Sequence, residues 1–308
     1  MAMMKRMSLF LLLNFVVMGT LMAIVHFFGL GNYTTAYGMD YTKLAIFCLV
    51  WGMGGAMISL LLSKWMAKMS MGVQIIDPNT RNADERALVE LVHRYSRQAG
   101  LSKMPEVGIY DSPEVNAFAT GPTRNNSLVA VSTGLLRRLD QRSVEGVIGH
   151  EVAHIANGDM VTMALLQGVV NAFVMAAARV IAMVISNALK SNDDRGQGLG
   201  PLAHFAVVFV LEMVFMVIGS MIMMWFSRQR EFRADKGGAQ YAGRDAMVSA
   251  LASLQRLQDV NYEVASQEGQ AQPAFASMKI SATKPGFAAL FRTHPTLEER
   301  ILRLQRGI

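Results

Sequence analysis

Long hydrophobic runs separated by polar segments are the dominant pattern of this chain, and they predict four membrane-crossing helices. Each run has at least about the 20 residues that a helix needs to cross a hydrocarbon core of roughly 30 Å. The first two runs contain no Asp, Glu, Lys or Arg, whereas the third contains Arg179 and the fourth contains Glu212. The four runs cover residues 9–30, 44–63, 160–189 and 202–226.

The same pattern divides the chain into two membrane hairpins and two polar parts. Residues 1–68 form the first predicted hairpin and residues 160–226 the second, while 69–159 and 227–308 are polar enough to fold outside the bilayer. A cleaved signal peptide is the alternative for the first run. That run is too long for one, and no small-residue cleavage site precedes the polar link at 31–43. We therefore expect the first run to remain as a membrane helix.

Basic residues predict which side of the membrane the polar parts occupy. Lys5 and Arg6 precede the first run, and Lys64 and Lys68 follow the second, whereas the loop inside each hairpin holds few basic residues. Lys and Arg accumulate on the cytoplasmic side of membrane proteins. Both termini and both polar parts are therefore expected in the cytoplasm. The net charge of +6 then reflects this orientation, and we expect no nucleic-acid partner.

Composition narrows the class of protein further. Of the 308 residues, 52% are hydrophobic and only 17% are charged, where a soluble domain carries about 25% charged residues. This balance argues against an ordinary soluble enzyme and against a disordered chain. The single cysteine, Cys48, excludes an intramolecular disulfide framework and a Cys-rich metal site.

Shorter periodic patterns predict an α+β fold for the polar parts, with Ser143 and Asp159 as helix N-caps and a capping box opened by Thr296. The predicted strands are Glu106–Tyr110, Val115–Thr120 and Ser127–Val131. The predicted helices are Asn82–Gln98, Ser132–Leu139, Ser143–Ala156 and a last one at the C-terminus.

The candidate chemistry lies in the segment from His150 to His154, which reads His-Glu-Val-Ala-His. Histidines at positions i and i+4 of a helix share one face, so their imidazoles can hold one Zn²⁺ together. Glu151 is one position further round, where it can reach a metal-activated water as a general base without being a ligand. The alternative is an ordinary helix with two surface histidines. The pattern is rare enough by chance to favour the zinc interpretation.

A catalytic zinc site normally has three protein ligands and one open position, so a third ligand must come from elsewhere in the chain. The candidates are His93, His204, His294, Glu231 and Asp235. The chain enters the membrane soon after Gly158 and returns near Phe226 on the same side, which brings Glu231 back beside the histidines. Asp235 follows one turn later on the same helical face, where it can accept the second N–H of an imidazole.

The motif His150–His154, followed by Asn157–Asp159 and by Ser227–Asp235, resembles the bacterial HtpX heat-shock membrane metalloproteases, which are relatives of the CAAX prenyl protease. The resemblance extends over essentially the whole chain. It implies a multi-pass zinc endopeptidase of the bacterial inner membrane with a cytoplasmic active site in a zincin-like, gluzincin α+β domain. It also implies a role in the quality control of damaged or misassembled membrane proteins, overlapping with an ATP-dependent membrane protease.

The resemblance also assigns roles to individual residues. By the family pattern, His150, His154 and Glu231 bind one zinc ion per chain, Glu151 is the general base, and Asp235 supports a ligand.

Two further sites follow from the same resemblance. Asn116, Ala117, Phe118 and Ala119 are similar to the edge strand over which zincins bind an extended peptide by main-chain pairing. The alternative is a plain core strand. His294 matches a family motif thought to face the catalytic centre, where a donor could stabilise an oxyanion. The alternative is a histidine at a helix entrance.

Other interpretations of the sequence are also possible. A protease dedicated to a prenylated or other specific peptide would share the zinc site. The CAAX prenyl protease encloses a large chamber, however, and this chain is too short to form one. A transporter or inactive scaffold would explain Arg179 and Glu212 but not the zinc set. These two charges lie at equal predicted depth, so we expect them to pair; the alternative is a water-filled cavity that solvates each one. His26, His93 and His204 are expected to have no catalytic role.

Overall fold

The computed structural model describes residues 15–16, 18–31, 33–35, 38–192, 199–267 and 293–307. The chain divides into two compact units. The helical unit lies within residues 1–60 and 163–223, and the mixed unit lies within residues 61–162 and 224–308.

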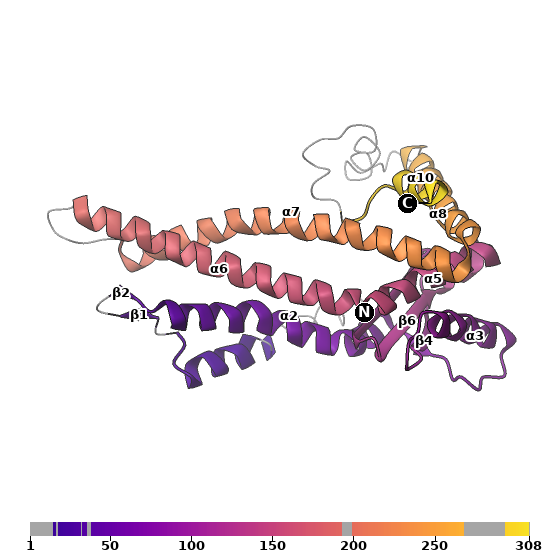
Figure 1. The fold of residues 1–308 in the computed structure, drawn as a ribbon, viewed down its shortest axis with the longest axis horizontal. Helices are drawn as coiled ribbons and strands as arrows, with labels where there is room; N and C mark the ends of the chain where they lie inside the picture. Colours follow the sequence, from indigo (N-terminus) through magenta and orange to yellow (C-terminus); the bar gives the residue numbers. More distant parts are fainter. Residues whose placement is uncertain are drawn as a thin grey trace. The chain divides into compact units, whose positions relative to one another are not determined.

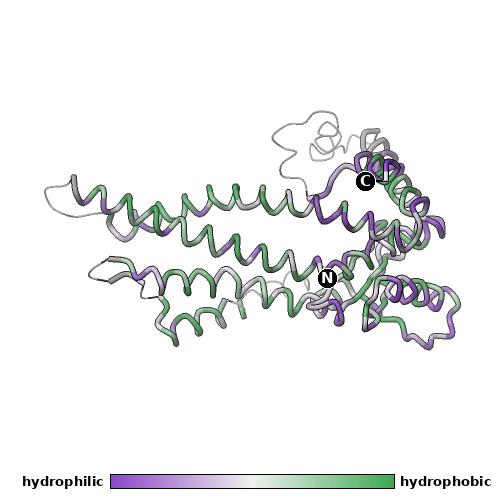
Figure 2. Tube along the Cα trace, in the orientation of Figure 1, coloured by the Kyte–Doolittle hydropathy of each residue, from purple (hydrophilic) through white to green (hydrophobic). Residues whose placement is uncertain are grey.

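Three helices of the described residues are long and apolar enough to cross a membrane: α2 (Tyr41–Met71), α6 (Asp159–Asn192) and α7 (Pro201–Ala242). Figure 2 shows that hydrophobic residues dominate most of their length. The helices contain the predicted runs 44–63, 160–189 and 202–226, but α2 and α7 extend well beyond them. Helical hydrogen bonding continues there through the polar residues that follow each run.

The first predicted run, 9–30, is described only in part. Residues 1–14 lie outside the described residues, and the described part contains the apolar helix Met18–Phe27. That segment is shorter than the roughly 20 residues that a crossing needs. A fourth crossing therefore stays a prediction. Between this segment and α2 lies a short antiparallel pair, β1 (Thr34–Thr35) and β2 (Gly38–Met39).

Small residues allow close packing inside the helical unit. A Cβ atom at Gly52 of α2 would lie 2.4 Å from the backbone nitrogen of Ala172 on α6. A Cβ atom at Gly219 of α7 would lie 2.7 Å from Cγ1 of Val170. Such close approach is how helices associate where lipid provides no hydrophobic driving force between them.

Arg179 of α6 and Glu212 of α7 form an ion pair, with Nη1 2.6 Å from Oε1. The same nitrogen donates a hydrogen bond to the carbonyl oxygen of Met175 at 2.9 Å. The guanidinium also lies 5.4 Å from the ring centroid of Phe47. The predicted pairing is therefore confirmed, and the alternative of two separately solvated charges is wrong.

The mixed unit contains a four-stranded sheet in the order β3-β4-β6-β5. The strands are β3 (Gln74–Ile75), β4 (Glu106–Tyr110), β5 (Ala117–Thr123) and β6 (Asn126–Ser132). Strands β4 and β6 are parallel and the other neighbours are antiparallel. β4 has the predicted bounds, β5 begins two residues later than predicted, and β3 is too short to give a sequence pattern. β5 lies at one edge of the sheet.

The hairpin between β5 and β6 depends on one glycine. The pairing register shifts between Thr120 and Thr123, where Gly121 has φ +147°. A Cβ atom on Gly121 would lie 2.2 Å from the carbonyl oxygen of Asn126. Only glycine tolerates both the conformation and the contact.

Five helices of the described chain complete the mixed unit: α3 (Ala83–Gln98), α4 (Thr133–Arg138), α5 (Gln141–Asn157), α8 (Arg244–Gln267) and α10 (Leu297–Arg306). In Figure 1, α3 and α5 lie beside β4 and β6. Val92 of α3, Val129 and Val131 of β6, and Ile148 and Val152 of α5 are fully buried in the main core. This core holds α5 against the sheet.

Two predicted helix caps are wrong. Asp140, not Ser143, is the N-cap of α5, because its Oδ1 accepts a hydrogen bond from the Ser143 amide at 2.7 Å. Asp159 begins α6, but its carboxylate points instead to a histidine of α5. Thr296 does cap α10, accepting from the Glu299 amide at 3.2 Å.

Candidate metal centre

Helix α5 presents His150 and His154 on one face because the two residues are four positions apart. Their Nε2 atoms are 3.1 Å apart, and their rings are nearly perpendicular. The opposite face, with Ile148 and Val152, is buried in the core. The helix ends at Gly158, whose left-handed φ of 69° suits a glycine C-cap. The local sequence therefore orients both imidazoles.

Glycines allow α7 to approach this part of α5 closely. A Cβ atom on Gly149 would lie 3.1 Å from the carbonyl oxygen of Gly238, and one on Gly238 would lie 3.0 Å from the His150 amide nitrogen. A Cβ atom on Gly237 would lie 2.7 Å from the methyl group of Ala153. Larger side chains at these positions would push the helices apart. The close approach places Glu231, two turns earlier on α7, beside the histidines.

Glu231 completes a group of three buried side chains whose candidate ligand atoms all lie within 4.8 Å of one another. Its Oε1 is 3.5 Å from Nε2 of His154, and its Oε2 is 3.5 Å from Nε2 of His150. Ligand atoms at about 2.0–2.2 Å from a tetrahedral metal ion stand roughly 3.4 Å from each other. With one ligand atom from each residue, the three groups lie close enough together that they would hold one metal ion between two imidazoles and a carboxylate. The structure thus brings together the three ligands that the sequence predicted.

Each histidine uses its other ring nitrogen to contact a carboxylate. Nδ1 of His150 is 3.0 Å from Oδ1 of Asp235, and Nδ1 of His154 is 2.6 Å from Oδ2 of Asp159. Both carboxylates are buried. Such contacts fix the tautomer and ring orientation of a metal-binding histidine. Asp235 was predicted in this position, whereas sequence reasoning treated Asp159 only as a helix cap.

Arg300 of α10 is a residue of the site that the sequence did not reveal. Its Nε and Nη2 donate hydrogen bonds of 2.8 and 2.6 Å to the two carboxylate oxygens of Asp235. Its Nη1 lies 3.6 Å from Oε2 of Glu231. Arg300 is buried, so α10 contributes a buried positive charge to the cluster. No sequence signal separated it from the other basic residues of α10.

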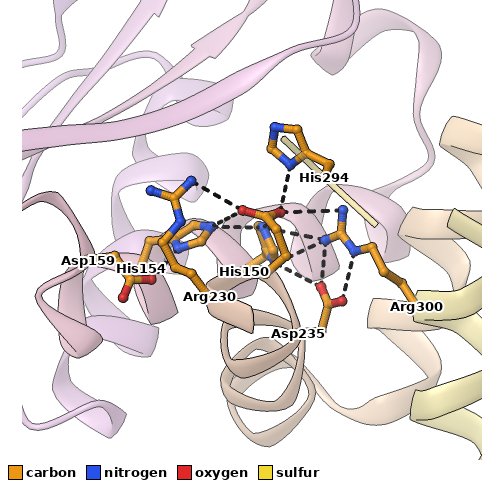
Figure 3. Close-up of polar contacts among 8 residues, drawn as sticks. His150, His154, Asp159, Arg230, Asp235, His294 and Arg300 are labelled. Atoms are coloured by element: carbon orange, nitrogen blue, oxygen red, sulfur yellow. Dashed lines mark hydrogen bonds and ion pairs between the residues drawn. The ribbon is translucent and has the colours of Figure 1, made fainter. Parts of the chain in front are cut away.

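His294 and Arg230 also contact the third ligand, as Figure 3 shows. Nδ1 of His294 is 3.1 Å from Oε2 of Glu231, and Nη2 of Arg230 is 3.4 Å from Oε1. The His294 side chain is 59% exposed, whereas that of Glu231 is 2% exposed. His294 therefore lies beside the cluster, and its role in catalysis stays a prediction. Arg230 was not predicted as part of the site.

The carboxylates of the cluster stabilise the charged forms of His150 and Arg300. Burial alone would lower the pKa of His150, but hydrogen bonds with Asp235 and Glu231 outweigh it and raise the pKa to about 9. Burial would likewise lower the pKa of Arg300, and its hydrogen bonds with Asp235 raise it. A metal ion would therefore bind in competition with a proton on His150.

The predicted base and substrate strand lie on elements next to the cluster. Glu151 is half-buried on α5 and is not one of the three clustered ligands. Asn116 is exposed just before β5, and its amide nitrogen lies 3.1 Å from Oγ of Ser132, which accepts its hydrogen bond. Ala117, Phe118 and Ala119 lie in β5, which pairs on one side with β6 and has no strand on its other side among the described residues.

Of the described histidines, His26, His93 and His204 are not members of the clustered ligand group. Nε2 of His93 is 3.2 Å from the carbonyl oxygen of Pro105. His26 and His204 belong to the helical unit.

Comparison with known proteins agrees with this geometry. The model of peptidase family M48 matches residues 82–308. A protein of Bacillus licheniformis named Protease HtpX homolog is 48% identical, over 98% of this chain and 99% of its own. Proteins named Protease HtpX from Hydrogenovibrio crunogenus and Shewanella oneidensis are 47% and 49% identical, each over 98% of this chain and over 97% and 99% of their own.

A solved structure has a similar fold. The crystal structure of S. mikatae Ste24p matches 98% of this chain and 64% of its own, with a TM-score of 0.61. The identity is only 14%, so this similarity concerns the fold.

Proposed function

The chain belongs to peptidase family M48 and is a membrane-bound metalloprotease. We propose that it is a zinc endopeptidase that cleaves damaged or misassembled proteins at the cytoplasmic face of the bacterial inner membrane. The main support for the proposal is that three buried candidate ligands, from α5 and α7, lie together beside the edge strand β5.

The donor set supports zinc as the metal. Two imidazole nitrogens and one carboxylate oxygen, from His150, His154 and Glu231, are the ligands of a known class of catalytic zinc site. When bound, zinc supplies Lewis-acid polarisation of the scissile carbonyl and activation of a water molecule. Asp159 and Asp235 hold the two imidazoles in the orientation that binding requires.

Glu151 is the proposed general base. It follows His150 on α5, so its carboxylate lies one position round from the ligand face. In this role it accepts a proton from the attacking water and returns it to the nitrogen of the leaving amine. His294, exposed beside Glu231, is the proposed donor to the oxyanion that develops on the scissile carbonyl.

The edge strand β5 is the proposed binding site for the substrate backbone. The free side of Ala117–Ala119 offers N–H and C=O groups to an extended peptide, which can pair as an additional strand. Asn116 is held at the start of this strand by Ser132. Main-chain pairing tolerates many sequences, and this tolerance suits an enzyme that acts on unfolded segments rather than on one dedicated peptide.

The location and the partners follow from the membrane helices and the resemblance to HtpX. The excess of basic residues beside the runs supports a cytoplasmic mixed unit, with the bilayer around the helical unit. The proposed substrates are unfolded or misassembled membrane proteins, and the enzyme would overlap in function with an ATP-dependent membrane protease. A fluorescent reporter fused to the C-terminus tests the orientation, because a periplasmic terminus would contradict it.

Three variants of the full chain test the mechanism. Glu151→Gln keeps size and helix but removes the proton acceptor, so it should retain zinc while casein cleavage falls by about 10²–10⁴-fold. Glu231→Ala should lower zinc content as well as activity, because two histidines alone form a weak site. Glu145→Gln, on the same helix, is the matched control. Full zinc with near-normal turnover in Glu151→Gln would refute the assignment of the base.

A substrate comparison tests the proposed class. Purified enzyme should cleave an unfolded membrane protein faster than a prenylated peptide of similar length. The reverse preference would instead support a protease dedicated to prenylated peptides. A metal-free preparation that stays folded and cannot be loaded with zinc would support an inactive scaffold or a transporter.

A further inference from the structure

The turn between β5 and β6 lies beside the ends of two candidate membrane helices. Nζ of Lys64, where the hydrophobic run of α2 ends, donates a hydrogen bond of 2.9 Å to Oδ1 of Asn126. On its other side, the guanidinium of Arg124 packs over Gly158, just before α6 begins; a Cβ atom on that glycine would lie 3.1 Å from Nε of Arg124. The turn is therefore at the level where α2 and α6 leave the hydrocarbon, which is the level of lipid headgroups.

A cavity of about 410 Å³ opens between this turn and the junction of α5 and α6. Its polar lining comes from Thr123, Arg124, Asn125, Asn157 and Thr162. These side chains include hydroxyl, amide and guanidinium donors and no carboxylate. The charged and polar part of the lining therefore favours an anion over a cation.

Arg124 is free to bind that anion, whereas the nearby lysines are occupied. Nζ of Lys64 is 2.9 Å from Oε1 of Glu106, and Nζ of Lys68 is 2.6 Å from Oε2 of the same residue. Arg124 is exposed, and the described part of the chain gives its guanidinium no acidic partner. An arginine fork matches the oxygens of a phosphate group in a bidentate manner.

We propose that this cavity binds the phosphate of an anionic phospholipid headgroup, with Arg124 as its principal donor. The lining without a carboxylate, and an arginine with no acidic partner among the described residues, favour an anion; the position at the ends of two membrane helices favours a lipid over a soluble anion. An acidic stretch of a substrate that runs along β5 would meet the same arginine, because the strand ends at Thr123. The experiment below distinguishes binding of an acidic peptide from binding of a lipid.

The test measures lipid binding to the purified full chain by native mass spectrometry from detergent. Phosphatidylglycerol is titrated against the unsubstituted chain, Arg124→Gln, Arg124→Lys and the control Arg137→Gln, an exposed arginine on α4. One basic residue near an anionic surface contributes an affinity of about fivefold. We therefore expect the first bound lipid to be about fivefold weaker in Arg124→Gln and unchanged in Arg137→Gln. Arg124→Lys should lie between them, because lysine keeps the charge but lacks the bidentate fork. Unfolding temperature and zinc content, measured on each variant, verify that it is folded.

The result that overturns the proposal is equal phosphatidylglycerol affinity in Arg124→Gln and in the unsubstituted chain. Equal binding of zwitterionic phosphatidylcholine, or displacement of the lipid by inorganic phosphate, would also overturn it, because the site would not be specific for an anionic lipid. Displacement by a soluble acidic peptide would overturn it in favour of a substrate site at the end of β5.

Discussion

Replacing Arg300 tests whether the ion pair between α10 and Asp235 stabilises the metal site. Its guanidinium and the Asp235 carboxylate share two hydrogen bonds of 2.6 and 2.8 Å, and the two side chains are 8% and 3% exposed. Arg300→Met removes one partner and leaves a buried carboxylate facing only His150. Breaking a buried ion pair in this way costs about 3–5 kcal/mol. At about 2–4 °C per kcal/mol for a domain of roughly 150–250 residues, the apparent Tm should fall by about 6–20 °C.

The assay is thermal unfolding of the purified full chain in detergent, with zinc content measured in parallel. The matched control is Arg303→Met on the same helix. Arg303 is 41% exposed and pairs with Glu299 at 3.2 Å, and an exposed pair contributes about 0–1 kcal/mol. The control should therefore lose at most about 4 °C.

A double variant separates stability from metal binding. Replacing both partners, as Arg300→Met with Asp235→Leu, removes the buried charges together and should recover much of the lost Tm. Zinc affinity should fall in this double variant, because His150 has lost the carboxylate that orients it. The reasoning is refuted if Arg300→Met loses no more Tm than Arg303→Met and keeps all of its zinc.

Two further predictions concern contacts elsewhere in the chain. Asp159→Asn should weaken zinc affinity by about 10–100-fold in chelator competition, because the charged acceptor for Nδ1 of His154 is lost; unchanged affinity would contradict the supporting role of Asp159. In the helical unit, Arg179→Glu and Glu212→Arg should each lower Tm and membrane abundance, since one unpaired charge within a membrane helix costs about 2.5–3.5 kcal/mol. The double swap should recover much of both losses, and additive losses would count against the pairing.

Much of the site was predictable because its signals are local or are constrained by the membrane. The spacing of His150 and His154 places both on one face of a helix whatever the rest of the chain does. Glu231 was predictable because a membrane hairpin must return the chain to the side that it left. The pairing of Arg179 with Glu212 followed from the cost of unpaired charge at equal depth in neighbouring helices.

Long-range packing alone decided the remaining features. Arg300 contacts Asp235 across 65 positions of sequence, and its place on an amphipathic helix gave no sign that it is buried. Asp159 was indistinguishable in the sequence from an ordinary N-cap, because the same residue type serves both purposes; only the fold of the α5–α6 turn aimed its carboxylate at His154. A helix period determines which face a residue occupies, but the partner of that face depends on how distant elements pack.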